Sequence, residues 1–237
     1  MHYLYLLLNL GSVSIPFLFS FHPKLKFYKY WKALAFGFFI SMLLFIPWDI
    51  FFTKHHIWSF NPNYLLNVEL LWLPIEEWLF FICIPYACVF THFALLYYFP
   101  GLKLSDALSK TIGYLLIALF VVTSIYNHDK WYTFVNFLVA TFVTTLVLIT
   151  NPRLLKTYLL TFLVMLVPFF IVNGILTGSC IENEVVWYNN NENLNMRLFT
   201  IPVEDVAYAF SLILLNLYIV KYFDNKILKT PTLITHQ

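Results

Sequence analysis

The chain has 237 residues, of which 61% are hydrophobic, 21% are aromatic and only 11% are charged. A soluble domain carries roughly 25% charged residues, so this chain has too few charges to cover a water-facing surface. The composition therefore excludes a soluble enzyme, a nucleic-acid-binding protein and a disordered chain, and it predicts an integral membrane protein. The formal net charge of +2 adds little, because the distribution of charge matters more in a membrane.

Seven stretches are long and apolar enough to cross the hydrocarbon core, which takes about 20 residues of helix. The first has no basic residue before it and no small-x-small cleavage site, so we interpret it as a retained helix rather than a signal peptide. The stretches are apolar on every face, which favours α-helices over the strands of a membrane β-barrel. They cover residues 3–21, 32–52, 71–98, 107–126, 131–150, 155–176 and 198–220.

Lysine and arginine are distributed unequally between the two ends of these seven spans. Because basic residues favour the cytoplasmic side, the bias predicts an outside N-terminus and a cytoplasmic C-terminus, in the plasma membrane. One side carries eleven basic residues: Lys24, Lys26, Lys29, Lys32, Lys103, Lys110, Arg153, Lys156, Lys221, Lys226 and Lys229. The other side carries three: Lys54, Lys130 and Arg197.

The chain also contains an internal repeat. The segment Pro74-Ile75-Glu76-Glu77 matches Pro202-Val203-Glu204-Asp205 at an offset of 128 residues. The repeat unit has three helices, and the fourth span between the units restores a common orientation. The sequence thus predicts a 3+1+3 arrangement of parallel repeats about an axis along the membrane normal. The predicted units are residues 1–100, a linker helix at 101–130, and residues 131–237.

The most informative residues are the acids of the duplicated motif, Glu76, Glu77, Glu204 and Asp205. The last span is long enough only if it begins near Leu198, which predicts that its two acids lie a turn or two below the outer surface. Ionisable groups inside a membrane cost about 2.5–3.5 kcal/mol each on insertion scales and suggest a functional site. The alternative is an interfacial cap, because the first turn of a helix favours negative charge. The duplication favours the functional interpretation.

Other polar residues are expected at the same depth. Asp49, Asn173 and Glu204 each lie 17 residues from a lysine at the inner end of their span. At 1.5 Å per residue they should lie about 25 Å above the cytoplasmic edge. Adjacent acids point about 100° apart on a helix, so we expect one acid of each pair to face the interior. A layer that holds both neutral and ionised carboxyl groups is suited to general acid–base catalysis.

Many aromatic residues are close in the sequence to the polar residues of this layer. Most of them are expected to form an interfacial belt or to face lipid. A subset that faces the carboxyl groups could hold a carbocation by cation–π attraction. The predicted substrate-binding residues are Trp48, Asp49, Trp78, Phe80, Asn173 and Tyr208.

The seven spans, the tandem three-helix repeat and the duplicated P-x-E-[ED] motif resemble the flavin-free membrane lycopene cyclases, in the form in which two three-span units are fused. The resemblance covers nearly the whole chain. It implies an intramolecular lyase or isomerase of carotenoid biosynthesis that closes the ψ end groups of lycopene into β-ionone rings without redox change. The family's catalytic motif falls on Pro74, Glu76 and Glu77 and on Pro202, Glu204 and Asp205.

The implied mechanism begins with a neutral carboxylic acid, which protonates the terminal double bond. The neighbouring double bond then closes the ring, and a carboxylate removes a ring proton. The sequence does not assign the acid and base roles to individual residues. The resemblance implies a carotenoid substrate and the lipid bilayer as partners, and the oligomeric state stays open.

A small 3+1+3 transporter with proton-coupling carboxylates is the main alternative. Against it, the inner two-thirds of the third, fifth and seventh spans is almost wholly apolar. The chain has no G-x-G-x-x-G or P-loop motif, so we expect no nucleotide cofactor. We also expect no metal site at His55 and His56 or at Cys88 and His92, and we expect His92 to hydrogen-bond within the bundle.

Overall fold

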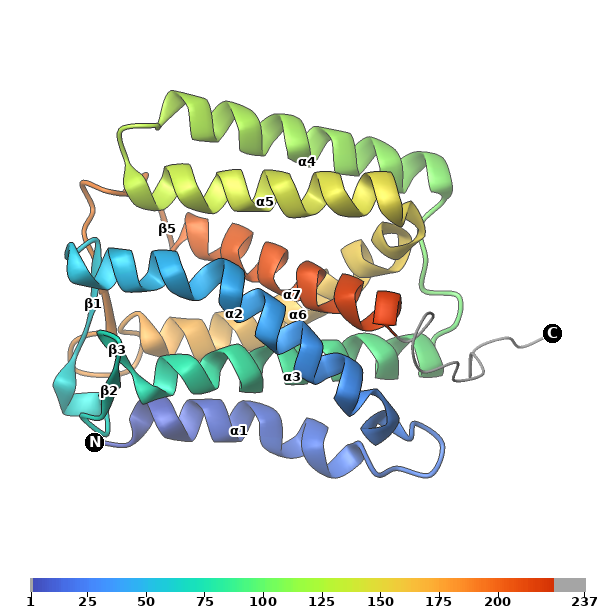
Figure 1. Cartoon of the computed structure of the whole chain (residues 1–237), viewed down its shortest axis with the longest axis horizontal. Helices are drawn as coiled ribbons and strands as arrows, with labels where there is room; N and C mark the ends of the chain where they lie inside the picture. Colours follow the sequence, from blue (N-terminus) through green and yellow to red (C-terminus); the bar gives the residue numbers. More distant parts are fainter. Residues whose placement is uncertain (1, 224–237) are drawn as a thin grey trace.

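The computed structural model describes residues 2–223, and these residues form seven helices that run side by side along the molecule (Figure 1). Six of the helices are long and apolar enough to cross a membrane, whereas α1 is apolar but has only 16 residues. This confirms the predicted all-α membrane class, with a first helix shorter than the expected 3–21. The helices are α1 (Leu4–Phe19), α2 (Trp31–Lys54), α3 (Ile75–Tyr98), α4 (Asp106–Tyr126), α5 (Trp131–Thr150), α6 (Pro152–Leu176) and α7 (Val203–Phe223).

The start of α1 and the end of α7 lie at opposite ends of the bundle (Figure 1). This is the arrangement that an odd number of spans requires. Lys226 and Lys229, which contribute to the predicted orientation, lie outside the described residues, as does the end of the predicted second unit.

Short strands and one 3₁₀ helix, η2 (Pro62–Tyr64), gather at the end of the bundle where α3 and α7 begin. The other 3₁₀ helix, η1 (Phe27–Tyr30), precedes α2 at the opposite end (Figure 1). The strands are β1 (Trp58–Phe60), β2 (Glu69–Leu70), β3 (Leu73–Pro74), β4 (Val186–Tyr188), β5 (Arg197–Leu198) and β6 (Ile201–Pro202).

Helices α3 and α7 begin later than the sequence predicted, at residues 75 and 203 rather than 71 and 198. The residues before each helix form a two-residue antiparallel hairpin, β2 with β3 and β5 with β6. Leu71 and Phe199 turn these hairpins with φ angles of 52° and 59°, which a right-handed helix does not allow. The prediction was wrong at these positions because short apolar strands and helix segments have the same hydrophobic pattern.

One ribbon joins segments that are far apart in the sequence. Strand β1 pairs with β4 in antiparallel register, so that Trp58 lies opposite Tyr188 and Phe60 lies opposite Val186. The ribbon lies beyond the first turns of α3 and α7 (Figure 1). It thus covers the end of the bundle that holds the acidic motifs.

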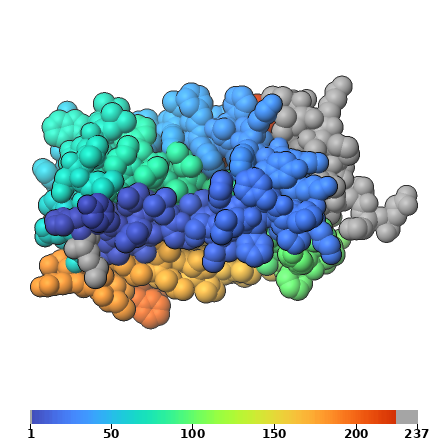
Figure 2. All heavy atoms as spheres, turned by 90° about the horizontal axis from the view of Figure 1, so that it is seen from below, coloured from blue at the N-terminus to red at the C-terminus, as the bar shows by residue number. Residues whose placement is uncertain are grey.

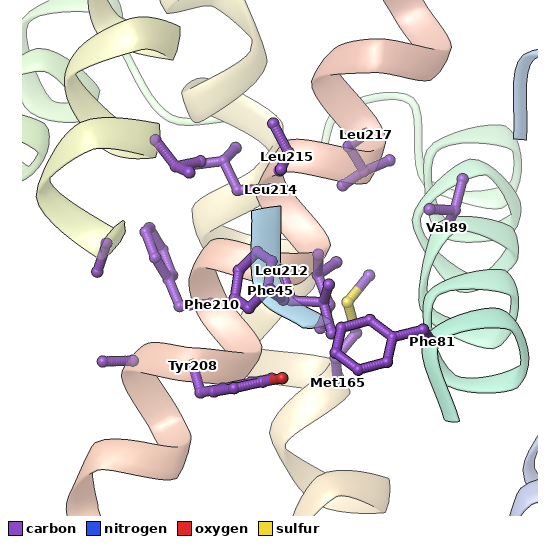
Figure 3. Close-up of a cluster of buried hydrophobic side chains, with 14 of the residues drawn as sticks. Phe45, Phe81, Val89, Met165, Tyr208, Phe210, Leu212, Leu214, Leu215 and Leu217 are labelled. Atoms are coloured by element: carbon purple, nitrogen blue, oxygen red, sulfur yellow. The ribbon is translucent and has the colours of Figure 1, made fainter. Parts of the chain in front are cut away.

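Helix α7 is central in the bundle: its residues are buried along most of its length, and α2, α3 and α5 pack against it. Figure 3 shows this core, in which Phe45 of α2, Phe81 of α3 and Met165 of α6 pack around Tyr208 and Leu212 of α7. Helices α1 and α4 lie at the periphery, α1 against α3 and α4 against α5. The acids at the start of α7 therefore stand on a rigid, fully packed helix.

Candidate active site

All four acids of the duplicated motif lie in the first turn of a helix, Glu76 and Glu77 in α3 and Glu204 and Asp205 in α7. The second pair thus lies at the start of α7, whereas a helix that began at residue 198, as expected, would have placed these acids in its second turn. The helix dipole favours negative charge at this position, as the capping alternative requires. An interfacial cap would contact water, however, whereas the side chains of Glu76 and Glu204 are 0% exposed.

Glu76 and Glu204 fix the loops that lead into their own helices. Glu76 Oε1 accepts a hydrogen bond of 2.6 Å from the Leu66 amide. Glu204 Oε1 accepts bonds of 2.7 Å from the Leu194 amide and of 2.7 Å from the Thr133 hydroxyl. The first acid of each pair is therefore anchored to backbone, in the same way in both halves of the chain.

Glu77 and Asp205, the second acids of the two pairs, accept hydrogen bonds from tyrosines instead. The Tyr5 hydroxyl of α1 donates a bond of 2.6 Å to Glu77 Oε2. The Tyr132 hydroxyl of α5 donates to Asp205 Oδ1.

Asp205 Oδ2 also accepts bonds of 2.8 Å from Asn173 Nδ2 and of 3.1 Å from the Tyr188 hydroxyl. Among the described residues, Asp205 thus has three side-chain donors, whereas Glu77 has one. The two carboxyl groups occupy equivalent positions in the repeated motif but different hydrogen-bonding environments.

The sequence reasoning missed the two tyrosines. A signal was present, because Tyr5 and Asn9 recur as Tyr132 and Asn136 in a Y-x-x-x-N pattern. Both asparagines also serve the site: Asn9 Nδ2 donates 2.8 Å to the Glu76 carbonyl, and Asn136 Nδ2 donates 2.7 Å to the Glu204 carbonyl. These bonds tie α1 to α3 and α5 to α7 at the first turn of each acidic helix.

Glu77 and Asp205 open into one cavity of about 680 Å³. Helices α1, α3, α6 and α7 form most of its walls, and strands β1 and β4 cover its end next to the first turns of α3 and α7. Three of the predicted substrate-binding residues, Phe80, Asn173 and Tyr208, line this cavity with the two acids. The structure therefore brings one carboxyl group from each half of the chain to a shared, largely apolar space.

The other three predicted substrate-binding residues lie outside the cavity wall. Asp49 Oδ2 accepts a bond of 3.1 Å from the Tyr208 hydroxyl, and the Trp48 ring lies 5.3 Å from the Tyr208 ring. Asp49 and Trp48 therefore contact Tyr208 on the side that faces away from the cavity. The Trp78 indole donates 3.1 Å to the Leu70 carbonyl in the β2–β3 hairpin, away from the cavity.

An aromatic cluster covers Asp205 at the end of the cavity next to the β1–β4 ribbon. The ring centroids of Trp58, Tyr132 and Tyr188 lie 5.4–6.0 Å from one another, and all three residues line the cavity. Aromatic faces next to a carboxylate attract a positive charge, because both the negative face of the ring and the negative carboxylate stabilise a cation. This part of the site is suited to a cation in an otherwise apolar space.

His92 lies deeper in the bundle. Its Nδ1 is 2.8 Å from the Thr161 hydroxyl and its side chain is buried, as expected from the sequence. Within residues 2–223, no group of three or more histidine, cysteine or acidic residues is placed to hold a metal ion.

Seven apolar helices and a buried carboxyl pair facing an apolar cavity define a polytopic membrane protein with an acidic site inside the helix bundle. The family model for lycopene cyclases matches residues 2–95 and 129–223, which are most of the chain. The chain therefore belongs to the lycopene cyclase family. Membership supports a lycopene cyclase function in carotenoid biosynthesis and implies an enzyme.

Curated relatives match shorter stretches. A bifunctional lycopene cyclase/phytoene synthase of Aspergillus oryzae is 36% identical over 56 residues, which are 24% of this chain and 10% of that protein. A bifunctional lycopene cyclase/phytoene synthase of Neurospora crassa is 39% identical over 41 residues, which are 17% of this chain and 7% of that protein. The chain thus matches only a tenth or less of these relatives. No solved structure matches it significantly.

Proposed function

We propose that this chain is a lycopene β-cyclase that closes the ψ end groups of lycopene into β-ionone rings by acid–base chemistry, with no net redox change and no cofactor. The observation that carries the proposal is that Glu77 and Asp205, one acid from each repeated motif, line the same apolar cavity. The apolar walls suit a hydrocarbon substrate, and the family membership suits cyclisation. In this reaction the protein acts as an isomerase or intramolecular lyase.

Asp205 is assigned the role of the anion that stabilises the carbocation. A carboxylate that accepts several hydrogen bonds is stabilised in its charged form, and Asp205 accepts three from side chains. The rings of Trp58, Tyr132 and Tyr188 add cation–π attraction beside it.

Glu77 is assigned the role of the proton donor. It has one side-chain hydrogen bond, from Tyr5, and it lies against the apolar cavity, where burial favours the neutral form of a carboxyl group. Glu77 transfers its proton to the terminal double bond of the ψ end group, which leaves a tertiary carbocation on the adjacent carbon. The neighbouring double bond attacks this carbon, so that one carbon–carbon bond forms and the six-membered ring closes.

The ring cation then loses a proton, and the electrons of the broken carbon–hydrogen bond form the ring double bond. Glu77, which the first step leaves ionised and weakly hydrogen-bonded, accepts this proton. Substrate and product are therefore isomers, and Glu77 is restored for the next end group. Asp205 remains an anion throughout this sequence.

Glu76 and Glu204 are proposed to position the site rather than to react. Their bonds to the Leu66 and Leu194 amides hold the entry loops against α3 and α7. The sequence alone predicted that all four acids are catalytic, and we now propose a role in the reaction for Glu77 and Asp205 only.

The domain organisation and topology are also proposed here. Two three-helix units, residues 1–100 and 131–237, with a linker helix at 101–130, account for the duplicated contacts of the two acidic helices. The basic residues favour a plasma-membrane protein with its N-terminus outside and its C-terminus in the cytoplasm. Reporter fusions at the two termini test this orientation, and reporters active on the same side contradict it.

The decisive test of function is expression in lycopene-producing cells followed by chromatography of the pigments. We expect products with β-ionone rings in the absence of added oxygen, nicotinamide or metal. Unchanged lycopene, together with proton-coupled uptake of a solute into vesicles, supports the transporter instead.

A further inference from the structure

The cavity has one exposed side. Among the residues that line it, the exposed ones are Leu7, Gly11 and Ile15 of α1 and Pro168 and Ile171 of α6. Leu7, Ile15 and Ile171 are 61%, 64% and 60% exposed, although they contribute to the cavity wall. The lining residues from α3, α5, α7 and the β1–β4 ribbon are buried or half-buried. The wall is therefore open where α1 and α6 meet.

Figure 2 shows this face of the molecule, with α1 in dark blue running along it and α6 in orange and yellow beside it. Helix α1 packs mainly on α3, and its contact with α6 is slight. Both helices are apolar along this face, so in a bilayer the open side meets acyl chains rather than water.

The cavity is elongated along the helix axes. Its lining residues on α3 extend from Glu77 to Thr91, and those on α6 extend from Phe162 to Leu176. Fourteen residues of helix correspond to about 21 Å, which is two-thirds of the hydrocarbon thickness. The acids lie at the outer end of this slot, and the remaining length runs beside the lipid. A linear hydrocarbon fits such a slot with one end at the acids.

Gly11 stands in the middle of the open side. Apart from the neighbouring backbone of α1 itself, no atom of the described residues lies within 4 Å of the place where a Cβ at Gly11 would be, and the residue lines the cavity. The φ angle of Gly11 is not in the left-handed region, so the backbone conformation does not require glycine there. A small residue at this position therefore leaves space free between α1 and α6.

We propose that a linear polyene hydrocarbon enters the cavity sideways from the bilayer between α1 and α6, past Gly11, with one end group leading. The identity of this occupant rests on the proposed function; the position of the entrance rests on the cavity and its exposed residues. The β1–β4 ribbon closes the outer end, so the substrate does not pass through water. The cavity contains a single pair of acids, Glu77 and Asp205. The two end groups of one hydrocarbon must therefore enter the cavity one after the other.

The test uses the full chain in lipid vesicles and a lipid-soluble aryl diazirine. On irradiation the probe loses dinitrogen, and the carbene that forms inserts into nearby carbon–hydrogen, oxygen–hydrogen or sulfur–hydrogen bonds. Labelling of Cys88, which lines the cavity, reports entry, and labelling of Ile82, which is 40% exposed on the same helix outside the cavity, reports contact with lipid. Mass spectrometry of the α3 peptide measures both.

Three variants make the test specific. Gly11→Trp places an indole in the opening, and we expect labelling of Cys88 to fall several-fold while labelling of Ile82 is unchanged. Gly11→Ala adds only a methyl group in open space and should label like the unaltered protein. Gly101→Trp is the matched control, because Gly101 also has open space around it but lies in the loop after α3, away from the cavity.

Labelling of Ile82 shows that the Gly11→Trp protein is inserted in the bilayer. If Cys88 of this inserted variant is labelled as strongly as in the unaltered protein, the proposed entrance is wrong. Added lycopene should protect Cys88 and not Ile82 in the unaltered protein. If lycopene neither protects Cys88 nor is cyclised, while Gly11→Trp still blocks the probe, the entrance stands and the proposed function fails. If lycopene is cyclised equally fast by both proteins, the function stands and the entrance fails.

Discussion

The Tyr208 hydroxyl donates a hydrogen bond of 3.1 Å to Asp49 Oδ2 and so joins α7 to α2, helices from opposite halves of the chain. Tyr208 lines the cavity, whereas Asp49 lies behind it. The other oxygen of Asp49 is buried, and no partner for it exists among residues 2–223. The acid thus holds a wall residue in place and does not itself reach the cavity.

We expect Asp49→Asn to keep turnover close to that of the unaltered protein, because an asparagine oxygen can accept the same bond from Tyr208. Thermal unfolding in detergent should show equal or higher stability, since a neutral amide is cheaper to bury than a carboxylate. Asp49→Leu is the contrasting variant. It leaves the Tyr208 hydroxyl without its acceptor and should cost about 1–3 kcal/mol. Strong loss of turnover in Asp49→Asn contradicts this assignment.

The two acids of each motif should respond differently to amide substitution. Glu77→Gln and Asp205→Asn should each lower turnover by about 10²–10⁴, the usual range for loss of acid–base or charge-stabilising groups. Glu76→Gln and Glu204→Gln keep an oxygen for the loop amides and should retain most of the activity per molecule. Pigment formation normalised to protein in the membrane measures both. Near-normal turnover in Glu77→Gln and Asp205→Asn identifies these acids as structural.

The donors to Asp205 should contribute to the rate. Tyr132→Phe and Tyr188→Phe each remove one hydrogen bond to this carboxylate and keep the ring. A bond to a charged group is worth about 1.5–3 kcal/mol, so turnover should fall by roughly 10–100-fold if the anion stabilises the transition state. Tyr64→Phe is a matched control, because its hydroxyl binds the Glu182 carbonyl in an outer loop. Equal effects of all three substitutions indicate a general structural loss.

Tyr188 should also make the protein sensitive to alkali. Burial and, after it, the charge of Asp205 raise the pKa of the Tyr188 phenol well above its ordinary value of 10.0. The folded chain therefore keeps this phenol neutral at a pH where the unfolded chain ionises it. Its contribution to stability is complete below the unfolded pKa and is lost as the pH rises through the folded value.

We accordingly expect the unaltered protein to lose thermal stability as the pH rises above about 10, and Tyr188→Phe to lose less over the same interval. Unfolding in detergent at each pH measures the difference. Identical pH dependence of the two proteins shows that Tyr188 does not contribute.

The sequence predicted that the four acids gather at one end of the bundle, and the reason is physical. Four acids in two apolar spans are costly in a membrane, so their positions carry information that apolar residues lack. The 100° spacing of adjacent residues predicted that only one acid of each pair faces the interior, whereas all four acids are buried. The two members of each pair differ instead in their surroundings, because Glu77 and Asp205 line the cavity and Glu76 and Glu204 bind backbone.

Other features could not be predicted in this way. Tyr5 and Tyr132 lie near the ends of their spans, where tyrosine is common as an interfacial residue, so their bonds to the acids were not evident. Asp49 and Asn173 occupy the same predicted depth, yet only Asn173 reaches the cavity. Depth along a helix fixes the layer in which a residue lies, but the rotation of the helix decides what the side chain contacts. The catalytic roles stay predictions.

The pairing of β1 with β4 has a consequence for biosynthesis. Trp58 emerges from the ribosome long before Tyr188, and the ribbon that covers the cavity cannot form until β4 has been translated. A nascent chain that already contains Glu77 and its Tyr5 partner still lacks this cover and the Asp205 carboxyl group. The cavity with its two acids is therefore complete only after both halves of the repeat have been made.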